Sequence, residues 1–309
     1  MAVLTPEEVQ AKVQQGISLQ GAELSNINLQ GCCLDDGHFP QAYLRVANLS
    51  GASCNRADFT EAILVLSTLT GISLQDAHLT EAQLTSARLD SANLIGIHGV
   101  KLKLHGALLD QANAATAILE AVDLAEATGH YACFRDAILI QADLSQSDFK
   151  GANFSRAKLN DANLSQAQFS EATFAHARLE RSQFIQSKLK KSDFTGADLI
   201  GSNLEQVNLQ GAKLQDASLD HVSLVQACMG ATHLEGASLY SANLEQADLR
   251  GAIVTHTDFR DANLERTQLH KVDFTDSIVS GALFTDAKGL SSAQKQLLRK
   301  RGALNIPSS

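Results

Sequence analysis

The sequence predicts an all-β solenoid, a four-sided parallel β-helix with a short capping helix at each end. Three observations lead to this fold class: a large apolar residue at every fifth position, identical residues at intervals of twenty, and a helix-start pattern near each chain end. A chain with these two periods turns a corner once per five residues and completes one coil in four corners.

The five-residue frame runs from Leu19 to Phe284 without an insertion and contains 54 central positions, of which 47 are Leu or Phe. All 12 Phe residues occupy central positions, and a small residue, most often Ala, stands two positions before the centre. A step of five would spread this row around every side of an α-helix, and it would alternate between the faces of a straight strand. The chain must therefore bend once per repeat, with the small and the large residue both pointing inward.

The twenty-residue period indicates four sides per coil. Positions twenty apart form a column, because they lie one above the other in successive coils of such a helix. One column holds Gln at six successive positions: Gln146, Gln166, Gln186, Gln206, Gln226 and Gln246. Identical side chains one coil apart can stack in ladders. A three-sided coil would instead repeat at intervals of fifteen.

An open β-helix exposes backbone groups and core side chains at both ends, so each end needs a cover. Residues Thr5 to Glu8 have the spacing of a capping box with proline at the first helical position, and Ser291 to Gln294 repeat that spacing. The chain therefore divides into three expected parts: an N-terminal capping helix in residues 1–16, the repeat β-helix in 17–287, and a C-terminal capping helix with a tail in 288–309.

The two expected helices also present side chains to cover the core. We expect Val9, Val13 and Ile17 to line one side of the first helix, and Ala293 and Leu297 to pack from the second. The outer face of the second helix is basic, with Lys295, Arg299, Lys300 and Arg301. Two interpretations stay open: a plain lid on a monomer, or a dimer or partner contact through the C-terminal helix.

The composition excludes several classes of function. The net charge is −9, which opposes broad nucleic-acid binding. The N-terminus has neither a basic start nor a long apolar run, and no stretch has the length of a membrane span, so we expect a cytoplasmic protein without membrane contact. The five scattered Cys show no paired framework and predict reduced thiols.

The sequence indicates neither an enzyme nor a cofactor or metal site. Ser, His and Asp are abundant, but we expect them on flat outer faces, whereas catalysis needs a pocket that excludes water. His38, Asp58, His78 and His98 follow one another in a column, close enough for a metal to bridge. An ordinary polar face explains this column better, because no Cys or carboxylate cluster joins it.

Outward aliphatic residues are the candidate partner-binding site. Val100, Ile118, Ile138 and Ile140 flank the centres on one side of consecutive coils, and Ile63, Val65 and Leu66 form a second group on the next side. Outward positions are elsewhere mostly polar, so an apolar strip favours a protein partner. The alternative is that Val and Ile only satisfy β-propensity.

Two further features are local. The basic residues Arg178, Arg181, Lys188, Lys190 and Lys191 stand together in an acidic chain, which fits a solvated face or an anionic partner. The frame is weakest in residues 95–133, where Gly99, Ala114 and Gly129 are centres and larger residues replace some small ones. The sequence leaves open whether that stretch forms a local bulge or bend.

The repeat unit resembles a known family. The pattern Ala-Asp/Asn-Leu-x-x is present as Ala-Asp-Leu at residues 142–144 and 247–249 and, with Phe at the centre, as Ala-Asn-Phe at 152–154. It resembles the pentapeptide-repeat family over residues 17 to about 286. This resemblance implies a right-handed quadrilateral β-helix. The repeat number and the Gln and Asn content are similar to those of the family's cyanobacterial members, one of which regulates heterocyst formation.

The resemblance also implies two functions. The first is a non-catalytic protein-binding or regulatory scaffold with a protein partner. The alternative is a DNA-mimicking binder of a type II topoisomerase, similar to the resistance proteins of the family, which present acidic faces and dimerise through C-terminal helices. The column with Glu205, Glu245 and Glu265 fits this alternative, while the basic cluster and the basic C-terminal helix interrupt it.

Overall fold

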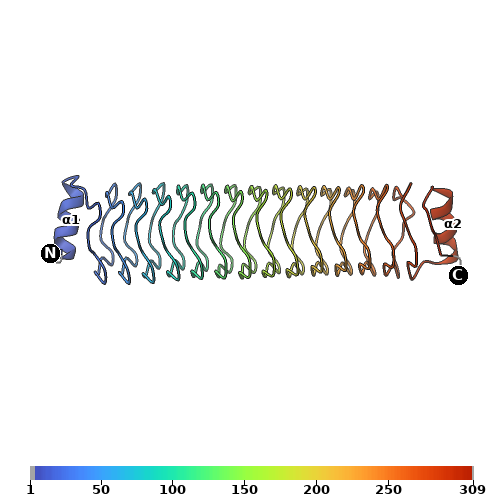
Figure 1. Cartoon of the computed structure of the whole chain (residues 1–309), viewed down its shortest axis with the longest axis horizontal. Helices are drawn as coiled ribbons and strands as arrows, with labels where there is room; N and C mark the ends of the chain where they lie inside the picture. Colours follow the sequence, from blue (N-terminus) through green and yellow to red (C-terminus); the bar gives the residue numbers. More distant parts are fainter. Residues whose placement is uncertain (1–3, 308–309) are drawn as a thin grey trace. The chain divides into compact units, whose positions relative to one another are not determined.

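The computed structural model describes residues 4–307 and contains two compact units, unit 1 (Met1–Lys158) and unit 2 (Leu159–Ser309). Within each unit the chain runs in stacked coils of twenty residues (Figure 1). Parallel β-bridges join residues twenty apart, such as Glu23 with Tyr43 in unit 1 and Asn163 with Gln183 in unit 2. Each coil has four bridge positions, five residues apart, which confirms the predicted four-sided coil within each unit.

The coils are held together by backbone hydrogen bonds on both sides of each bridge. The Leu44 N–H donates to the Ile63 carbonyl of the next coil (2.8 Å), and the Tyr43 N–H donates to the Ala22 carbonyl of the preceding coil (2.9 Å). Because a side of the coil is only a few residues long, the pairing forms isolated bridges instead of long strands. The same donors and acceptors recur every five residues, which satisfies the buried backbone.

The corners are tight turns, and nearly all of them use left-handed backbone. The Ala47 N–H donates to the Leu44 carbonyl (3.1 Å), and Val46, the second residue after the centre, has φ of 58°. Glycine accepts this conformation without strain, but most corners carry other residues, including the β-branched Val46 and Thr116. A non-glycine residue costs about 1–2 kcal/mol in this region, so the repeated ladder and core must compensate at each corner without glycine.

The Asp or Asn before the centre completes the turn. Asn48 Oδ1 accepts a hydrogen bond from the Ser50 N–H (3.0 Å), and Asp58 Oδ1 accepts one from the Thr60 N–H (2.9 Å). The side-chain oxygen thus accepts a hydrogen bond from the backbone N–H of the residue that follows the centre. It is the physical reason for Asp or Asn at this position of the repeat.

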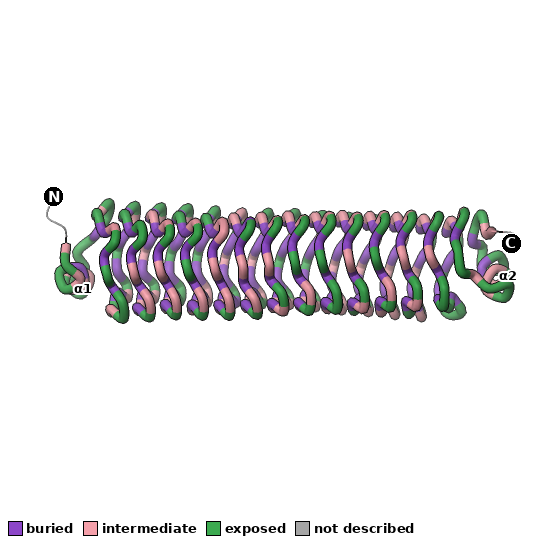
Figure 2. The backbone as a smooth tube through the Cα atoms, turned by 90° about the horizontal axis from the view of Figure 1, so that it is seen from below, coloured by how far each residue is buried: buried purple, intermediate pink, exposed green. Residues whose placement is uncertain are grey.

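The core of each unit consists of the inward positions. Every centre from Leu19 to Phe284 is buried, and so are the small positions except Ile17, Ala22 and Cys32. Buried and exposed residues accordingly alternate along each coil (Figure 2). The Phe39 and Phe59 rings stack with centroids 4.9 Å apart, as the column spacing requires.

Residues 95–133 contain no bulge, which settles the question that the sequence left open. Bridges with a spacing of twenty continue through this stretch, including His98 with Ile118 and Asn113 with Cys133. Volume is exchanged inside the core instead, because the Phe149 ring fills the space that a side chain at Gly129 would occupy. Compensation of this kind keeps the backbone regular.

Two helices lie at the ends of the described chain. Helix α1 (Pro6–Gln14) begins at Thr5, whose side chain accepts from the Glu8 N–H, and the Glu8 carboxylate accepts from the Thr5 N–H (2.8 Å). This is the predicted capping box. Val9 is the buried residue of α1, whereas Ile17 is 42% exposed, so its predicted covering role was wrong.

Helix α2 (Ser292–Lys300) is joined to the last coil of unit 2. Its buried residue is Leu298 instead of the predicted Leu297, and Ala293 is exposed. The Gln294 side chain donates to Asp273 Oδ1 (2.8 Å), and Arg301 donates to the Ser277 carbonyl (2.9 Å). No helix within residues 4–307 has the length and apolar content needed to cross a membrane.

Candidate interaction surfaces

The predicted apolar strip (Val100, Ile118, Ile138 and Ile140) lies on one side of the coils in unit 1. Ile118 and Ile138 form a parallel bridge and therefore stand side by side on adjacent coils. Val100 and Ile140 follow the buried centres of their own coils, with Glu120 between them in the column. All four side chains are half-buried, so the strip is a shallow apolar surface.

A hollow of about 600 Å³ adjoins the strip at the next corner. It is lined by Glu81, Gln83, Lys101, Lys103 and Ala121. Lys101 Nζ lies 3.5 Å from Glu81 Oε1 on the adjacent coil, whereas Ala121 supplies only a methyl group. The short side chain at Ala121 therefore opens a space in a corner that long polar residues otherwise fill.

A second apolar group is more exposed than the strip. The sequence indicated Ile63, Val65 and Leu66, and the structure places Tyr43 and Val46 beside them one coil earlier. Tyr43 is 44% exposed, Val46 53% and Leu66 57%. Tyr43 and Val46 could have been found from the sequence, because they occupy the same columns as Ile63 and Leu66.

The proposed histidine column separates into two pairs. His38 Nδ1 lies 3.1 Å from Asp58 Oδ2, and the His78 and His98 rings are 5.1 Å apart at a tilt of 33°. Within residues 4–307, no group of three or more His, Cys, Asp or Glu side chains could hold a metal ion. The polar-face interpretation accounts for both pairs.

His130 forms a clamp that the sequence reasoning missed. Its Nδ1 lies 3.3 Å from Asp110 Oδ2, and its Nε2 lies 3.3 Å from Asp148 Oδ2. Burial disfavours the charged ring, but the hydrogen bonds and the charges of Asp148 and Asp110 outweigh it and raise the pKa of His130. Asp110 stands one coil before His130 in the same column, which was the available signal.

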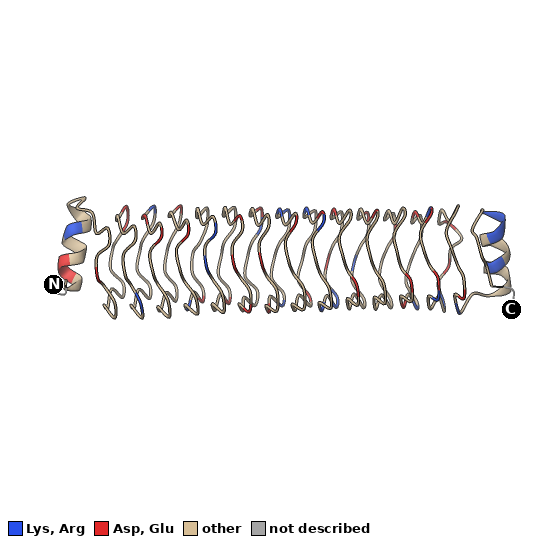
Figure 3. Cartoon of the chain, in the orientation of Figure 1, with Lys and Arg blue, Asp and Glu red and all other residues tan. Residues whose placement is uncertain are grey.

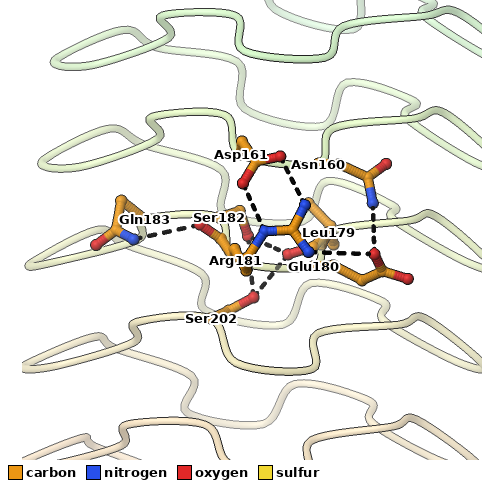
Figure 4. Close-up of polar contacts among 8 residues, drawn as sticks. All are labelled: Asn160, Asp161, Leu179, Glu180, Arg181, Ser182, Gln183 and Ser202. Atoms are coloured by element: carbon orange, nitrogen blue, oxygen red, sulfur yellow. Dashed lines mark hydrogen bonds and ion pairs between the residues drawn. The ribbon is translucent and has the colours of Figure 1, made fainter.

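The basic cluster (Arg178, Arg181, Lys188, Lys190 and Lys191) lies in unit 2. One of its members, Arg181, forms an ion pair with Asp161 of the adjacent coil. Figure 4 shows the Arg181 guanidinium against Asp161, with Nε–Oδ1 and Nη2–Oδ2 distances of 2.7 and 2.8 Å. This hydrogen bond lowers the pKa of Asp161. Glu180 lies 3.7 Å from the same guanidinium and accepts from Asn160. Arg181 therefore contributes little net charge to a partner.

The buried hydroxyls below this pair are also satisfied. Ser182 and Ser202, small residues on adjacent coils, both donate to the Leu179 carbonyl at 2.6 Å (Figure 4). A hydroxyl at the small position thus needs no water, since a carbonyl of the coil accepts its proton. This explains why Ser and Thr replace Ala there without disturbing the core.

A second hollow, of about 560 Å³, lies in unit 2. Three residues with little or no side chain line it, Gly230, Ala231 and Gly251, together with Cys228, Arg250 and Lys271 among others. Charged residues of both signs are spread over the coils (Figure 3). The expectation of flat outer faces was wrong at this place and at the hollow of unit 1, because short corner residues leave open space.

Solved structures of repeat proteins resemble the chain. HetL, described as involved in heterocyst differentiation regulation in the cyanobacterium Nostoc sp. strain PCC 7120, is 29% identical over 72% of this chain and 96% of its own, with a TM-score of 0.42. A trypsin-treated variant of QnrB1, a plasmid-mediated fluoroquinolone resistance protein, is 23% identical over 66% and 96%, with a TM-score of 0.47. No curated protein sequence matches the chain.

A family model described as pentapeptide repeats matches the chain in eight copies. The matches cover residues 34–65, 62–98, 131–166, 167–206, 177–216, 202–239, 217–255 and 254–286. Between the first and the last match only residues 99–130 are unmatched, and they lie within the part where Gly and Ala replace large centres. Because the matches span more than half of the sequence, the chain belongs to the pentapeptide-repeat family.

Proposed function

We propose that this protein is a non-catalytic protein-binding or regulatory scaffold, and that the strip Val100, Ile118, Ile138 and Ile140 is its partner-binding surface. The observation that carries this proposal is the side-by-side placement of Ile118 and Ile138 on adjacent coils. Outward side chains contribute little to the core of a solenoid, so apolar residues there gain most when another protein covers them.

The hollow beside the strip supports the same surface. A partner side chain could enter between Lys101, Lys103 and Glu81 while an apolar segment covers the isoleucines. An interface with an apolar centre and a charged rim has the general composition of protein–protein contacts. The group at Tyr43, Val46 and Leu66 would extend this interaction onto the neighbouring side of the coils.

A double variant tests the proposal. Ile118→Ser with Ile138→Ser should weaken capture of the native partner about tenfold, which corresponds to about 1.4 kcal/mol. The melting temperature should stay close to that of the wild type. Ile253→Ser with Ile278→Ser is the matched control, because these exposed isoleucines are 41% and 50% accessible and lie in unit 2. Proteins captured equally by all three forms would contradict the strip as the partner surface.

The alternative is a DNA-mimicking binder of a type II topoisomerase, supported by the column with Glu205, Glu245 and Glu265. In the structure Arg266 Nη1 lies 3.0 Å from Glu245 Oε1, and Val225 interrupts the column. Paired or interrupted carboxylates reproduce the regular charge of duplex DNA poorly. Inhibition of DNA supercoiling by the purified protein at stoichiometric concentration would favour the alternative over the scaffold.

The helices and the location complete the proposal. We infer that α1 and α2 cover the ends of their units, through buried Val9 and Leu298. All five cysteines are free thiols, which supports a reducing, cytoplasmic environment. Helix α2 carries exposed basic residues, so two oligomeric states stay open: a monomer, or a dimer that forms through this helix. Size-exclusion chromatography with light scattering distinguishes them by molecular mass. No direct nucleic-acid binding, membrane contact or cofactor forms part of this function.

A further inference from the structure

We propose that the hollow in unit 2 binds a phosphate-sized oxyanion, a role separate from the partner surface in unit 1. Its volume is about 560 Å³, and Gly230, Ala231 and Gly251 line it. Successive coils carry Lys191, Gly211, Ala231, Gly251 and Lys271 in one column. Between the two lysines, three short residues in succession therefore replace long ones, which leaves a site with polar walls.

The walls of this hollow are basic in a chain that is acidic overall. Arg250, His270 and Lys271 line it, and Asp248 is the carboxylate among the lining residues. Asp248 is occupied by Arg250, with Nε–Oδ1 and Nη2–Oδ2 distances of 2.8 and 2.6 Å. Among the described residues, no carboxylate lies within 4.0 Å of the Lys271 ammonium group. Lys271 thus brings uncompensated positive charge to the site.

A backbone donor also faces the hollow. In the preceding coil Asn208 Oδ1 accepts from the Gln210 N–H (3.1 Å), and in the next coil Asp248 Oδ1 accepts from the Arg250 N–H (3.1 Å). Cys228 occupies the intervening position and offers no such oxygen. Within residues 4–307 the Gly230 N–H has no acceptor. Since the coils repeat, this N–H points toward the side chain of Cys228, which lines the hollow.

These features select an anion with several acceptor oxygens. A phosphate oxygen could accept from the Gly230 N–H while Lys271 and the N–H groups of Arg250 that Asp248 leaves free contact the others. An uncharged apolar ligand would leave these donors without partners. The same chemistry is offered by free phosphate and by a phosphorylated side chain of another protein, and the experiment separates these sources.

Cys228 is a built-in reporter for occupancy. Cys228 lines the hollow and is exposed, and Cys33 in unit 1, which is also exposed, is an internal control. We expect millimolar inorganic phosphate, at fixed pH and ionic strength, to slow iodoacetamide alkylation of Cys228 at least threefold while Cys33 reacts at an unchanged rate. Peptide mass spectrometry measures both rates in one sample. Equal slowing of both thiols, or of neither, overturns the proposal.

Two variants make the test specific. Gly230→Gln introduces the residue found one coil earlier at Gln210, and a Cβ there meets only the Arg250 carbonyl at 3.7 Å, so the fold tolerates it. Gly230→Gln and Lys271→Gln should each abolish the phosphate-dependent part of the protection, whereas Lys103→Gln in unit 1 should retain it. The alkylation rate of Cys228 in each variant is compared with the rate of the same variant without phosphate. If phosphate still slows Cys228 alkylation in Gly230→Gln as much as in the wild type, the proposal is overturned.

A comparison of inorganic phosphate with a phosphoserine peptide shows whether the anion is free phosphate or a phosphorylated side chain. A phosphoserine peptide that protects Cys228 at concentrations tenfold below inorganic phosphate assigns the site to a phosphorylated partner. Equal potency of the two assigns it to free phosphate. The unphosphorylated peptide is the control, and protection by that peptide to the same degree would overturn the assignment to an oxyanion.

Discussion

The ring of Phe149 occupies the space in front of Gly129, one coil earlier in the same column, where a side chain on Gly129 would collide with ring atoms. Phe149 also packs edge-on against Phe134, with centroids 5.6 Å apart, and against Phe154 at 5.8 Å. A large ring on one coil and no side chain on the coil before it together fill the core. The two positions are therefore a compensating pair.

Restoring the usual residue at this centre should destabilise the protein. Gly129→Leu introduces a side chain into a space already filled by Phe149, and overpacking of this kind costs about 1–3 kcal/mol. Urea unfolding should show a lower midpoint. Met229→Leu, at a buried centre with a side chain of similar volume, is the control and should change stability by less than about 1.5 kcal/mol. Equal stability of Gly129→Leu and wild type would refute the pairing.

Removing a core ring should cost more than removing a surface amide. Phe154→Ala deletes a fully buried ring that stacks on Phe134 at 5.0 Å, and we expect a loss of about 3–5 kcal/mol. Gln186→Ala removes one exposed amide that donates to Gln206 at 2.8 Å, and this change should be much smaller. Calorimetric melting measures both. Similar melting shifts for the two variants would contradict the inward and outward assignment.

The sequence predicted the coil and its core because both depend on side-chain periods that are written directly into it. Leu and Phe every five residues, with Ala two positions before, suffice to place each centre inside. The sequence could not predict that Phe149 fills the space at Gly129, because this depends on the orientation of the Phe149 ring relative to the preceding coil. The hollow beside Cys228 was missed for a similar reason: a missing side chain has no pattern until the neighbouring columns are compared.

Left-handed corners offer a stabilising substitution. Val46 has φ of 58°, a conformation that a β-branched residue adopts only under strain, and its side chain is 53% exposed. Val46→Asn should raise the free energy of unfolding by about 1 kcal/mol, because Asn tolerates left-handed backbone and no core contact is lost. Val65→Asn, at a half-buried residue of the next coil with ordinary φ, should bring no gain. A lower denaturation midpoint for Val46→Asn would contradict corner strain.

The His130 clamp should give unit 1 a pH-dependent contribution to stability. Asp110 and Asp148 favour the charged ring in the folded protein, so the pKa of His130 is raised above its ordinary value of 6.5. A raised pKa in the folded protein stabilises it at a pH below the pKa of the unfolded chain, and that stability is lost as the pH rises through the pKa of the folded protein.

The loss in melting temperature caused by His130→Gln should therefore be largest near pH 6 and should shrink toward pH 9. His256→Gln, at a corner in unit 2 whose histidine shows no ion pair among the described residues, is the control and should show no such trend. A penalty for His130→Gln that stays constant from pH 6 to pH 9 would show that the ring acts by packing alone.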